Sequence, residues 1–93
     1  MIRSVKDRET ELLARGERSR RRPPDIQRRA AIALIRLDAA ATYADLHTGH
    51  GSDLKPRPDL GEDYHSIRIN DQWRVYFRWK VGDAFDVEVD DKH

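Results

Sequence analysis

Apolar and polar side chains alternate along the last third of the chain, which is the period-of-two pattern of half-buried strands. The alternation predicts three strands, over residues 64–69, 73–79 and 85–89, each rich in β-branched and aromatic residues. Only short segments separate these runs, so consecutive strands are expected to pair as hairpins. The pattern therefore predicts an antiparallel meander in this part of the chain.

Each predicted strand has one apolar and one polar face. The apolar positions, expected to face the core, are Trp73, Val75, Phe77, Trp79, Phe85, Val87 and Val89. The polar pattern places on the opposite face Arg74, Tyr76, Arg78, Asp86, Glu88 and Asp90. Because a slip of one residue would turn every side chain to the wrong face, matching the apolar faces fixes the register of the sheet.

This register places two arginines directly opposite each other. A three-residue loop over 70–72 pairs Ile67 with Val75 and Arg68 with Arg74. Like charges that face each other across a strand pair are destabilising. A purely structural sheet would tend to have an acid at one of the two positions, so the arginine pair is a candidate functional feature.

The first half of the chain has helical patterns. Residues 5–15 contain good helix formers and precede Gly16, a common helix stop. Residues 23–25, Pro-Pro-Asp, are typical of a helix start, and an apolar stripe follows them. The stripe consists of Ile26, Ala30, Leu34 and Leu37. Residues 42–46 predict a short capped turn of helix, and residues 47–61, with three Gly and two Pro, predict an irregular loop that is a candidate functional segment.

Two helices followed by a meander predict an α+β fold, with two N-terminal helices packed on the apolar side of a short antiparallel β-sheet. The 93 residues are expected to form a single domain, 1–93. The chain has no cysteine, which excludes a disulfide framework and a thiolate metal site. We expect a cytoplasmic protein with no signal peptide and no membrane span, because its longest uncharged apolar stretch, residues 30–35, is far below the ~20 residues that a span requires.

Charge is distributed unevenly along the chain, although the net charge is only +1. Residues 1–37 contain eleven Lys or Arg against five Asp or Glu, whereas residues 38–93 contain seven against twelve. A basic half is suited to contact with a polyanion or an acidic partner. An ordinary solvated basic surface explains the same asymmetry and is the commoner case, so charge alone does not assign a function.

The positive residues of the predicted sheet indicate phosphate chemistry. Arg78, Lys55 and Arg57 extend the array of Arg68 and Arg74 if the long loop folds over the sheet. Phosphoryl transfer requires fixed donors of this kind, because negative charge develops on the phosphate oxygens, and arginine can bind phosphate with two hydrogen bonds. The alternative is that the arginines pair with acids of the last strand, and both interpretations can hold together.

Histidines provide a candidate proton-transfer group but no metal site. The last strand would carry His93 to the same edge of the sheet as Arg74, and a pKa near ~6.5 suits proton transfer at neutral pH. An exposed terminal histidine without a role is the commoner explanation. His47, His50 and His65 lack the spacing of a metal-ligand set, so we predict no metal and no cofactor.

Residues 66–75, Ser-Ile-Arg-Ile-Asn-Asp-Gln-Trp-Arg-Val, closely resemble the Ser-Ile-Arg-Ile-Asn-Asp-Gln-Trp-Arg-Ile motif of HigB-type toxins in the RelE/ParE superfamily. Further segments that are similar to this family are 1–4, 9–11, 24–28, 37–40 and 86–93. The resemblance therefore spans the whole chain, with several motifs at matching spacing. It implies two N-terminal helices on a short antiparallel sheet, the RelE-like fold.

The resemblance implies the toxin of a type II toxin–antitoxin pair, a metal-independent endoribonuclease that cuts mRNA on the ribosome and so inhibits translation. Arg74 falls on the family's catalytic arginine, and His93 falls on a C-terminal histidine associated with proton transfer and substrate positioning. Arg68 matches a frequent family position and is a third candidate catalytic residue. The implied partners are a helix-turn-helix antitoxin of the HigA type, the ribosome and mRNA, and, through the antitoxin, operator DNA.

Two positions depart from the family pattern. The penultimate residue, commonly aromatic in the family, is Lys92, which can contact phosphate but cannot stack on a base. In the loop, Lys55 and Arg57 keep positive charge, while the family's usual lysine position is Pro58. These departures favour an alternative, a catalytically weak or inactive homologue that acts as an antitoxin-binding co-repressor, whereas Arg74 and His93 argue against it. A second alternative is a ParE-like inhibitor of DNA gyrase, which shares the fold but which the HigB-like Trp73-Arg74 and the terminal His93 disfavour.

Overall fold

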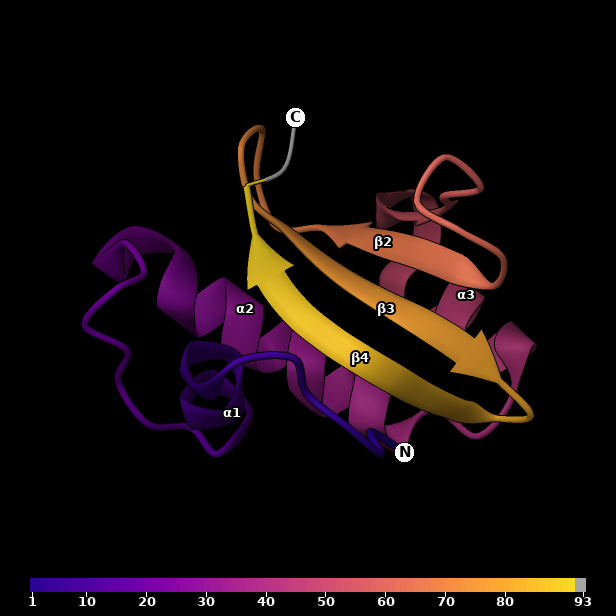
Figure 1. The fold of residues 1–93 in the computed structure, drawn as a ribbon, viewed down its shortest axis with the longest axis horizontal. Helices are drawn as coiled ribbons and strands as arrows, with labels where there is room; N and C mark the ends of the chain where they lie inside the picture. The colour runs from indigo at the N-terminus through magenta and orange to yellow at the C-terminus, as the bar shows by residue number, and fades with distance from the viewer. Residues whose placement is uncertain (92–93) are drawn as a thin grey trace.

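The computed structural model describes residues 1–91 of the chain. Its elements are α1 (Arg8–Ala14), α2 (Pro24–Ala39), α3 (Tyr43–His50), a short 3₁₀ turn (Gly51–Asp53), β1 (Leu54–Pro56), β2 (Tyr64–Arg68), β3 (Arg74–Lys80) and β4 (Asp83–Asp90). The strands form one antiparallel sheet in the order β1-β2-β3-β4. Helices α2 and α3 lie behind the sheet in Figure 1, against one of its faces. The predicted α+β fold is confirmed, with one helix more than expected.

The ends of α1 and α2 follow capping signals in the sequence. Asp7 begins α1, and its side chain accepts a hydrogen bond from the Thr10 N–H at 2.7 Å. Gly16, with φ 77°, adopts the left-handed conformation just past the end of this helix. Pro24 occupies the first position of α2, where a missing N–H costs nothing, and Asp25 follows in the first turn.

Among residues 1–91, no helix is long and apolar enough to cross a membrane.

Segment 47–61 is more regular than its glycines and prolines predict. The capping box at Thr42 begins α3 as expected, but the helix continues to His50. Residues Leu54–Pro56 then form β1, which pairs antiparallel with β2. Leu54 is buried in the core, and this tertiary contact stabilises a strand too short to show an alternating pattern. The prediction of one irregular loop was therefore wrong, and the meander gains a strand.

The β2–β3 hairpin has the predicted register. Ile67 lies opposite Val75, and Arg68 lies opposite Arg74. Asn70 shapes the connecting turn, because its side-chain oxygen accepts hydrogen bonds from two backbone N–H groups of the turn at 2.7 and 2.8 Å. The two arginines therefore face each other, as the hydrophobic pattern predicts.

A bulge in β4 corrects one predicted orientation. The pairing with β3 steps from Tyr76 opposite Glu88 to Arg78 opposite Phe85, so β4 contains one residue more than β3 over this stretch. Asp86 has φ 52°, an uncommon conformation for a residue other than glycine. The extra residue reverses the alternation beyond it, and Phe85 lies on the same face as Arg78. The prediction that Phe85 faces the core was therefore wrong.

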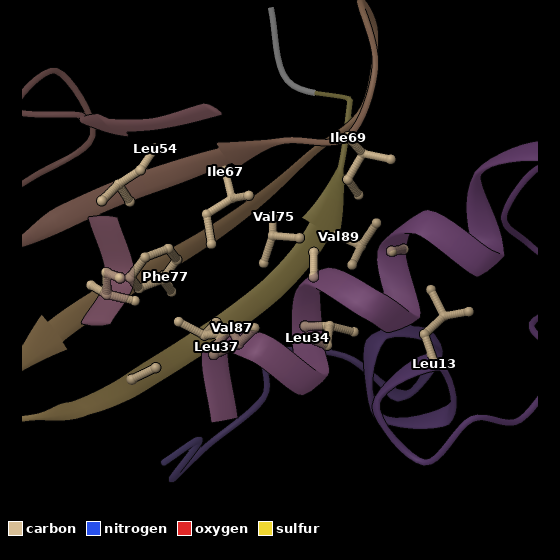
Figure 2. Packing of buried hydrophobic residues seen from close by; sticks show 14 of the residues in the cluster. Leu13, Leu34, Leu37, Leu54, Ile67, Ile69, Val75, Phe77, Val87 and Val89 are labelled. Atoms are coloured by element: carbon tan, nitrogen blue, oxygen red, sulfur yellow. The ribbon is translucent and has the colours of Figure 1, made fainter. Parts of the chain in front are cut away.

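The core lies between α2 and the apolar face of the sheet, as Figure 2 shows. Its buried residues from the strands are Leu54, Ile67, Val75, Phe77, Ala84, Val87 and Val89. Trp73 and Trp79 are partly buried and pack against this cluster. Burying a Leu, Ile, Val or Phe side chain stabilises the fold by about 1.5–3 kcal/mol. The core thus holds the sheet as a rigid platform for the side chains on its opposite face.

The first residues of the chain run parallel to β4, which the sequence analysis did not predict. Ile2 pairs with Ala84, and Val5 pairs with Val87. Four backbone hydrogen bonds of 2.8–3.1 Å join the two segments. An open strand edge is prone to pair with other chains, so the N-terminal segment protects this side of the sheet.

Candidate phosphate-binding site

Three positive side chains from three elements border one cavity on the face of the sheet opposite the helices. Arg68 of β2 and Arg74 of β3 lie opposite each other, and Lys55 of β1 lies opposite Ser66 of β2, on the side away from the core. The cavity has a volume of about 210 Å³. Its lining consists of Ser52, Asp53, Lys55, Arg68, Asp71 and Arg74. We refer to this candidate site as the phosphate-binding cavity.

Arg68 is held in place by the hairpin turn. Its guanidinium forms a salt bridge with Asp71 and donates a hydrogen bond from Nε to the Asn70 carbonyl at 3.3 Å. The side chains of this salt bridge are 47% and 95% exposed, so water screens it and its net contribution to stability is at most about 1 kcal/mol. Arg68 can therefore exchange the Asp71 carboxylate for a phosphate at little cost.

Arg74 forms no salt bridge with any of residues 1–91. Its Cα partner on β4 is Asp90, yet no salt bridge joins the two side chains. The Asp90 carboxylate instead accepts a hydrogen bond from the Asp91 N–H at 2.8 Å. Lys55 likewise forms no salt bridge with any of residues 1–91. The cavity therefore has two cations whose charge is open to an incoming anion.

Arg57 lies on the same face but outside the lining of the cavity. It donates hydrogen bonds to both carboxylate oxygens of Asp59, at 3.0 and 2.8 Å, and its guanidinium carbon lies 5.5 Å from the centre of the Tyr76 ring. The hydrogen bonds to Asp59 raise the pKa of Arg57 and lower the pKa of Asp59. The loop thus folds over the sheet, and Arg57 packs there on a buried tyrosine.

Arg78 is also separate from the cavity. It lies further along β3, opposite Tyr64 on one side and Phe85 on the other. Its guanidinium is 3.5 Å from the Asp86 carboxylate. The alternative of pairing with acids of the last strand therefore applies to Arg78, whereas Arg68 pairs within its own hairpin.

The described histidines occupy two places, because His47 and His65 both lie against the Tyr43 ring and His50 lies at the end of α3. His65 accepts or donates a hydrogen bond with the Tyr43 hydroxyl at 3.0 Å, and His50 is half-buried at the end of α3. Among residues 1–91, no three His, Asp or Glu side chains come together as a metal site would require. Lys92 and His93, predicted to contact phosphate and transfer protons, lie outside the described residues.

Three polar residues that border the cavity were not predicted from the sequence. Ser52 and Asp53 belong to the 3₁₀ turn before β1, and Asp71 belongs to the β2–β3 turn. The signals for Asp71 are its position between the two arginines in the chain and its place in the motif over residues 66–75. Ser52 and Asp53 carry no local signal, because β1 brings them to the site and β1 has no strand pattern of its own.

A sheet with helices on one face and a cationic cavity on the other defines a small α+β protein suited to meet an anion. Residues 6–93 match the family described as the RelE-like toxin of the type II toxin–antitoxin system HigB. The match leaves out only the first five residues, so the chain belongs to this family. No curated protein sequence gives a significant match. The protein is thus a toxin of a type II toxin–antitoxin system, a class that acts together with an antitoxin partner.

Proposed function

We propose that this toxin is an endoribonuclease that cuts mRNA on the ribosome without a metal ion of its own, with Arg74 as its principal catalytic residue. The observation that carries the proposal is the convergence of Lys55, Arg68 and Arg74 on one cavity opposite the helices. Fixed cations in such a place meet the negative charge that develops on a phosphate during transfer. The resemblance to HigB-type toxins points to the same reaction.

The proposed reaction is a transesterification within the RNA. The 2′-hydroxyl oxygen bonds to the adjacent phosphorus, and the bond between phosphorus and the 5′-oxygen breaks. The hydroxyl proton passes to a base, and another proton is delivered to the leaving 5′-oxygen. The products are a 2′,3′-cyclic phosphate and a 5′-hydroxyl end. The rate therefore depends on how well the protein stabilises the extra charge on the phosphate oxygens.

Each of the three cations suits a distinct part in this reaction. The Arg74 guanidinium has no salt-bridge partner among residues 1–91, and its planar fork can hold two phosphate oxygens at once. Arg68 is oriented by Asp71 and adds a second guanidinium from the facing strand. Lys55 adds a point charge from β1. We assign Arg57 and Arg78, which lie outside the cavity, to flanking phosphates of the RNA.

The proton steps are assigned from the sequence resemblance. His93 is the proposed proton-transfer residue, because imidazole changes charge near neutral pH. Lys92 is proposed to contact phosphate. The proposed partners are a helix-turn-helix antitoxin of the HigA type, the ribosome with its mRNA, and operator DNA contacted through the antitoxin. The proposed location is the cytoplasm, where the substrate is.

The test is cleavage of a defined mRNA on purified ribosomes, with the ends of the products identified chemically. We expect cutting that depends on the ribosome and leaves a cyclic phosphate and a 5′-hydroxyl. Elemental analysis of the purified toxin is expected to find no transition metal at stoichiometric level. Absence of cutting, together with antitoxin and operator binding, would support the co-repressor instead. Arrest of DNA synthesis before protein synthesis in cells would support a gyrase inhibitor.

A further inference from the structure

A second hollow lies beside the phosphate-binding cavity, between α2, the end of α3 and β2. Its volume is about 310 Å³. We name it the α2 groove, and the residues that matter in its lining are Arg29, Ile32, Arg36, His50, Asp53 and Arg68. Asp53 and Arg68 also border the phosphate-binding cavity, so the two hollows adjoin.

The rim of the α2 groove has a surplus of positive charge. Arg29 and Arg36 form no salt bridge with any of residues 1–91. Asp53 is the one carboxylate in the lining, against these two arginines and Arg68. Burial and the nearby Arg36 lower the pKa of His50, so this ring contributes no charge near neutral pH. The groove therefore favours a ligand with more than one negative charge.

Isoleucine side chains form part of the floor of the α2 groove, which favours a peptide over a nucleic acid. Ile32 is 39% exposed, and Ile67 and Ile69 lie deeper in the lining. Single-stranded nucleic acids bind by stacking bases on aromatic rings along a basic track, and the lining contains no Phe, Tyr or Trp. A peptide with apolar side chains on one face and carboxylates beside them matches both the floor and the rim.

We propose that the α2 groove is the docking site of the antitoxin, which inserts an amphipathic segment whose apolar side chains cover Ile32 and whose carboxylates pair with Arg29 and Arg36. The class of partner rests on the assignment of the chain as a type II toxin, and the chemistry of the segment rests on the groove. An acidic segment bound in the groove neutralises part of the positive charge that Asp53 alone does not balance.

Docking in the α2 groove also explains inhibition, a step that rests on the proposed function. Arg68 borders both hollows. A carboxylate of the docked segment beside Arg68 satisfies this guanidinium and repels a phosphate that approaches Arg74. The antitoxin therefore competes with RNA for one shared arginine and does not need to fill the phosphate-binding cavity.

Two double variants of the full chain, matched in charge and placed on the same helix, test the proposal. The groove variant combines Arg29→Glu with Ile32→Asp. The control variant combines Arg28→Glu with Ile35→Asp, at positions outside the lining of the groove. All four side chains are exposed, so we expect both variants to fold, and thermal unfolding checks this.

Binding is measured by calorimetry with the purified cognate antitoxin and, separately, with a short single-stranded RNA. We expect the groove variant to bind the antitoxin about thirtyfold more weakly or worse, and the control variant to stay within about threefold of wild type. RNA affinity is expected to fall in both variants and further in the groove variant, because its two new carboxylates lie in the hollow that Arg68 borders.

Several results would overturn the proposal. These are undiminished antitoxin binding by the groove variant, equal losses in both variants, or no antitoxin binding by the wild-type chain. A loss of RNA affinity in the groove variant with undiminished antitoxin binding would make the groove an RNA track instead. Because binding is measured without cutting, a toxin that fails to cleave mRNA leaves this result interpretable. Where cutting is observed, the groove variant is expected to remain active in the presence of antitoxin.

Discussion

The two sides of the sheet are built differently. At β4, the N-terminal segment pairs along the strand, the Thr10 hydroxyl accepts a hydrogen bond from the Val89 N–H at 2.9 Å, and Arg22 donates one to the Val89 carbonyl at 3.0 Å. At the β1 side, a three-residue strand borders the sheet, and Arg68 and Arg74 face each other. Stability is thus concentrated at β4, which lets the other side carry like charges that cost stability but suit an anion.

The largest effect on stability is expected for Arg22→Ala. The Arg22 side chain is 15% exposed and donates a hydrogen bond to the Val89 carbonyl. Its guanidinium also lies 3.4 Å from the Asp7 carboxylate, and the guanidinium carbon is 5.6 Å from the centre of the Trp73 ring. Losing the charged hydrogen bonds and the ring contact costs about 2–4 kcal/mol. Urea unfolding measures this loss in the free energy of unfolding.

The matched control for Arg22→Ala is Arg21→Ala. Arg21 is 83% exposed, and its carboxylate partner, Glu9, is as far as 3.9 Å away. We expect a change within about 0.5 kcal/mol for this control. Equal losses in the two variants would mean that the connector before α2, and not the β4 side, is the stabilising feature.

A smaller loss is expected for Thr10→Val. Thr10 is fully buried, and valine keeps its shape but leaves the Val89 N–H without an acceptor. A buried unpaired donor costs about 1–3 kcal/mol. Thr48→Val provides the control, because Thr48 is exposed on α3 and bonds only within its own helix. A Thr10 variant as stable as wild type would contradict the role given to this contact.

On the cationic side, Lys55→Ala is expected to reduce mRNA cutting by about tenfold, which corresponds to about 1.4 kcal/mol. Stability is expected to stay unchanged because Lys55 is exposed and forms no salt bridge within residues 1–91. Lys55→Arg is expected to restore most of the rate, since it restores the charge. Lys80→Ala, on β3 outside the cavity lining, is the control. A Lys55→Ala variant that cuts at the wild-type rate would show that β1 contributes no catalytic cation to the site.

The smallest expected effect is a pH dependence from His50. Burial and Arg36 lower the pKa of His50 below its ordinary value of 6.5, so the unfolded chain binds this proton more readily than the folded chain does. The stabilising contribution of neutral His50 is therefore present at pH values above its ordinary pKa and is lost as the pH falls below that pKa. Between about pH 7.5 and about pH 5, wild type is expected to lose more unfolding free energy than His50→Gln. Parallel curves for the two proteins would contradict the shift.

The sequence predicts the facing arginines because two local rules agree. The alternation of apolar residues and the length of the 70–72 turn leave a single register for Ile67 with Val75, and the pairing of Arg68 with Arg74 follows. The helix starts were predictable for the same reason, since capping residues act within one turn of the chain. Features that depend on a few neighbouring residues can thus be read directly.

Features that depend on distant contacts were not predictable. The left-handed conformation of Asp86 shifts Phe85 to the polar face, and the neighbouring residues do not predict this shift. The β1 strand exists because Leu54 enters the core, and it alone brings Asp53 beside the cations. The pairing of Ile2 with Ala84 joins the two ends of the chain, which no local pattern encodes.

The central claim is that Arg74 serves the reaction and not the fold, and Arg74→Ala tests it in two assays on one protein. We predict that ribosome-dependent cutting falls about a hundred- to a thousandfold, or about 3–4 kcal/mol. In the same preparation, the free energy of unfolding is predicted to stay constant or rise, because a repulsion with Arg68 is removed. Undiminished cutting would contradict the account, and so would a loss of more than about 1 kcal/mol of stability, which would make Arg74 a structural residue.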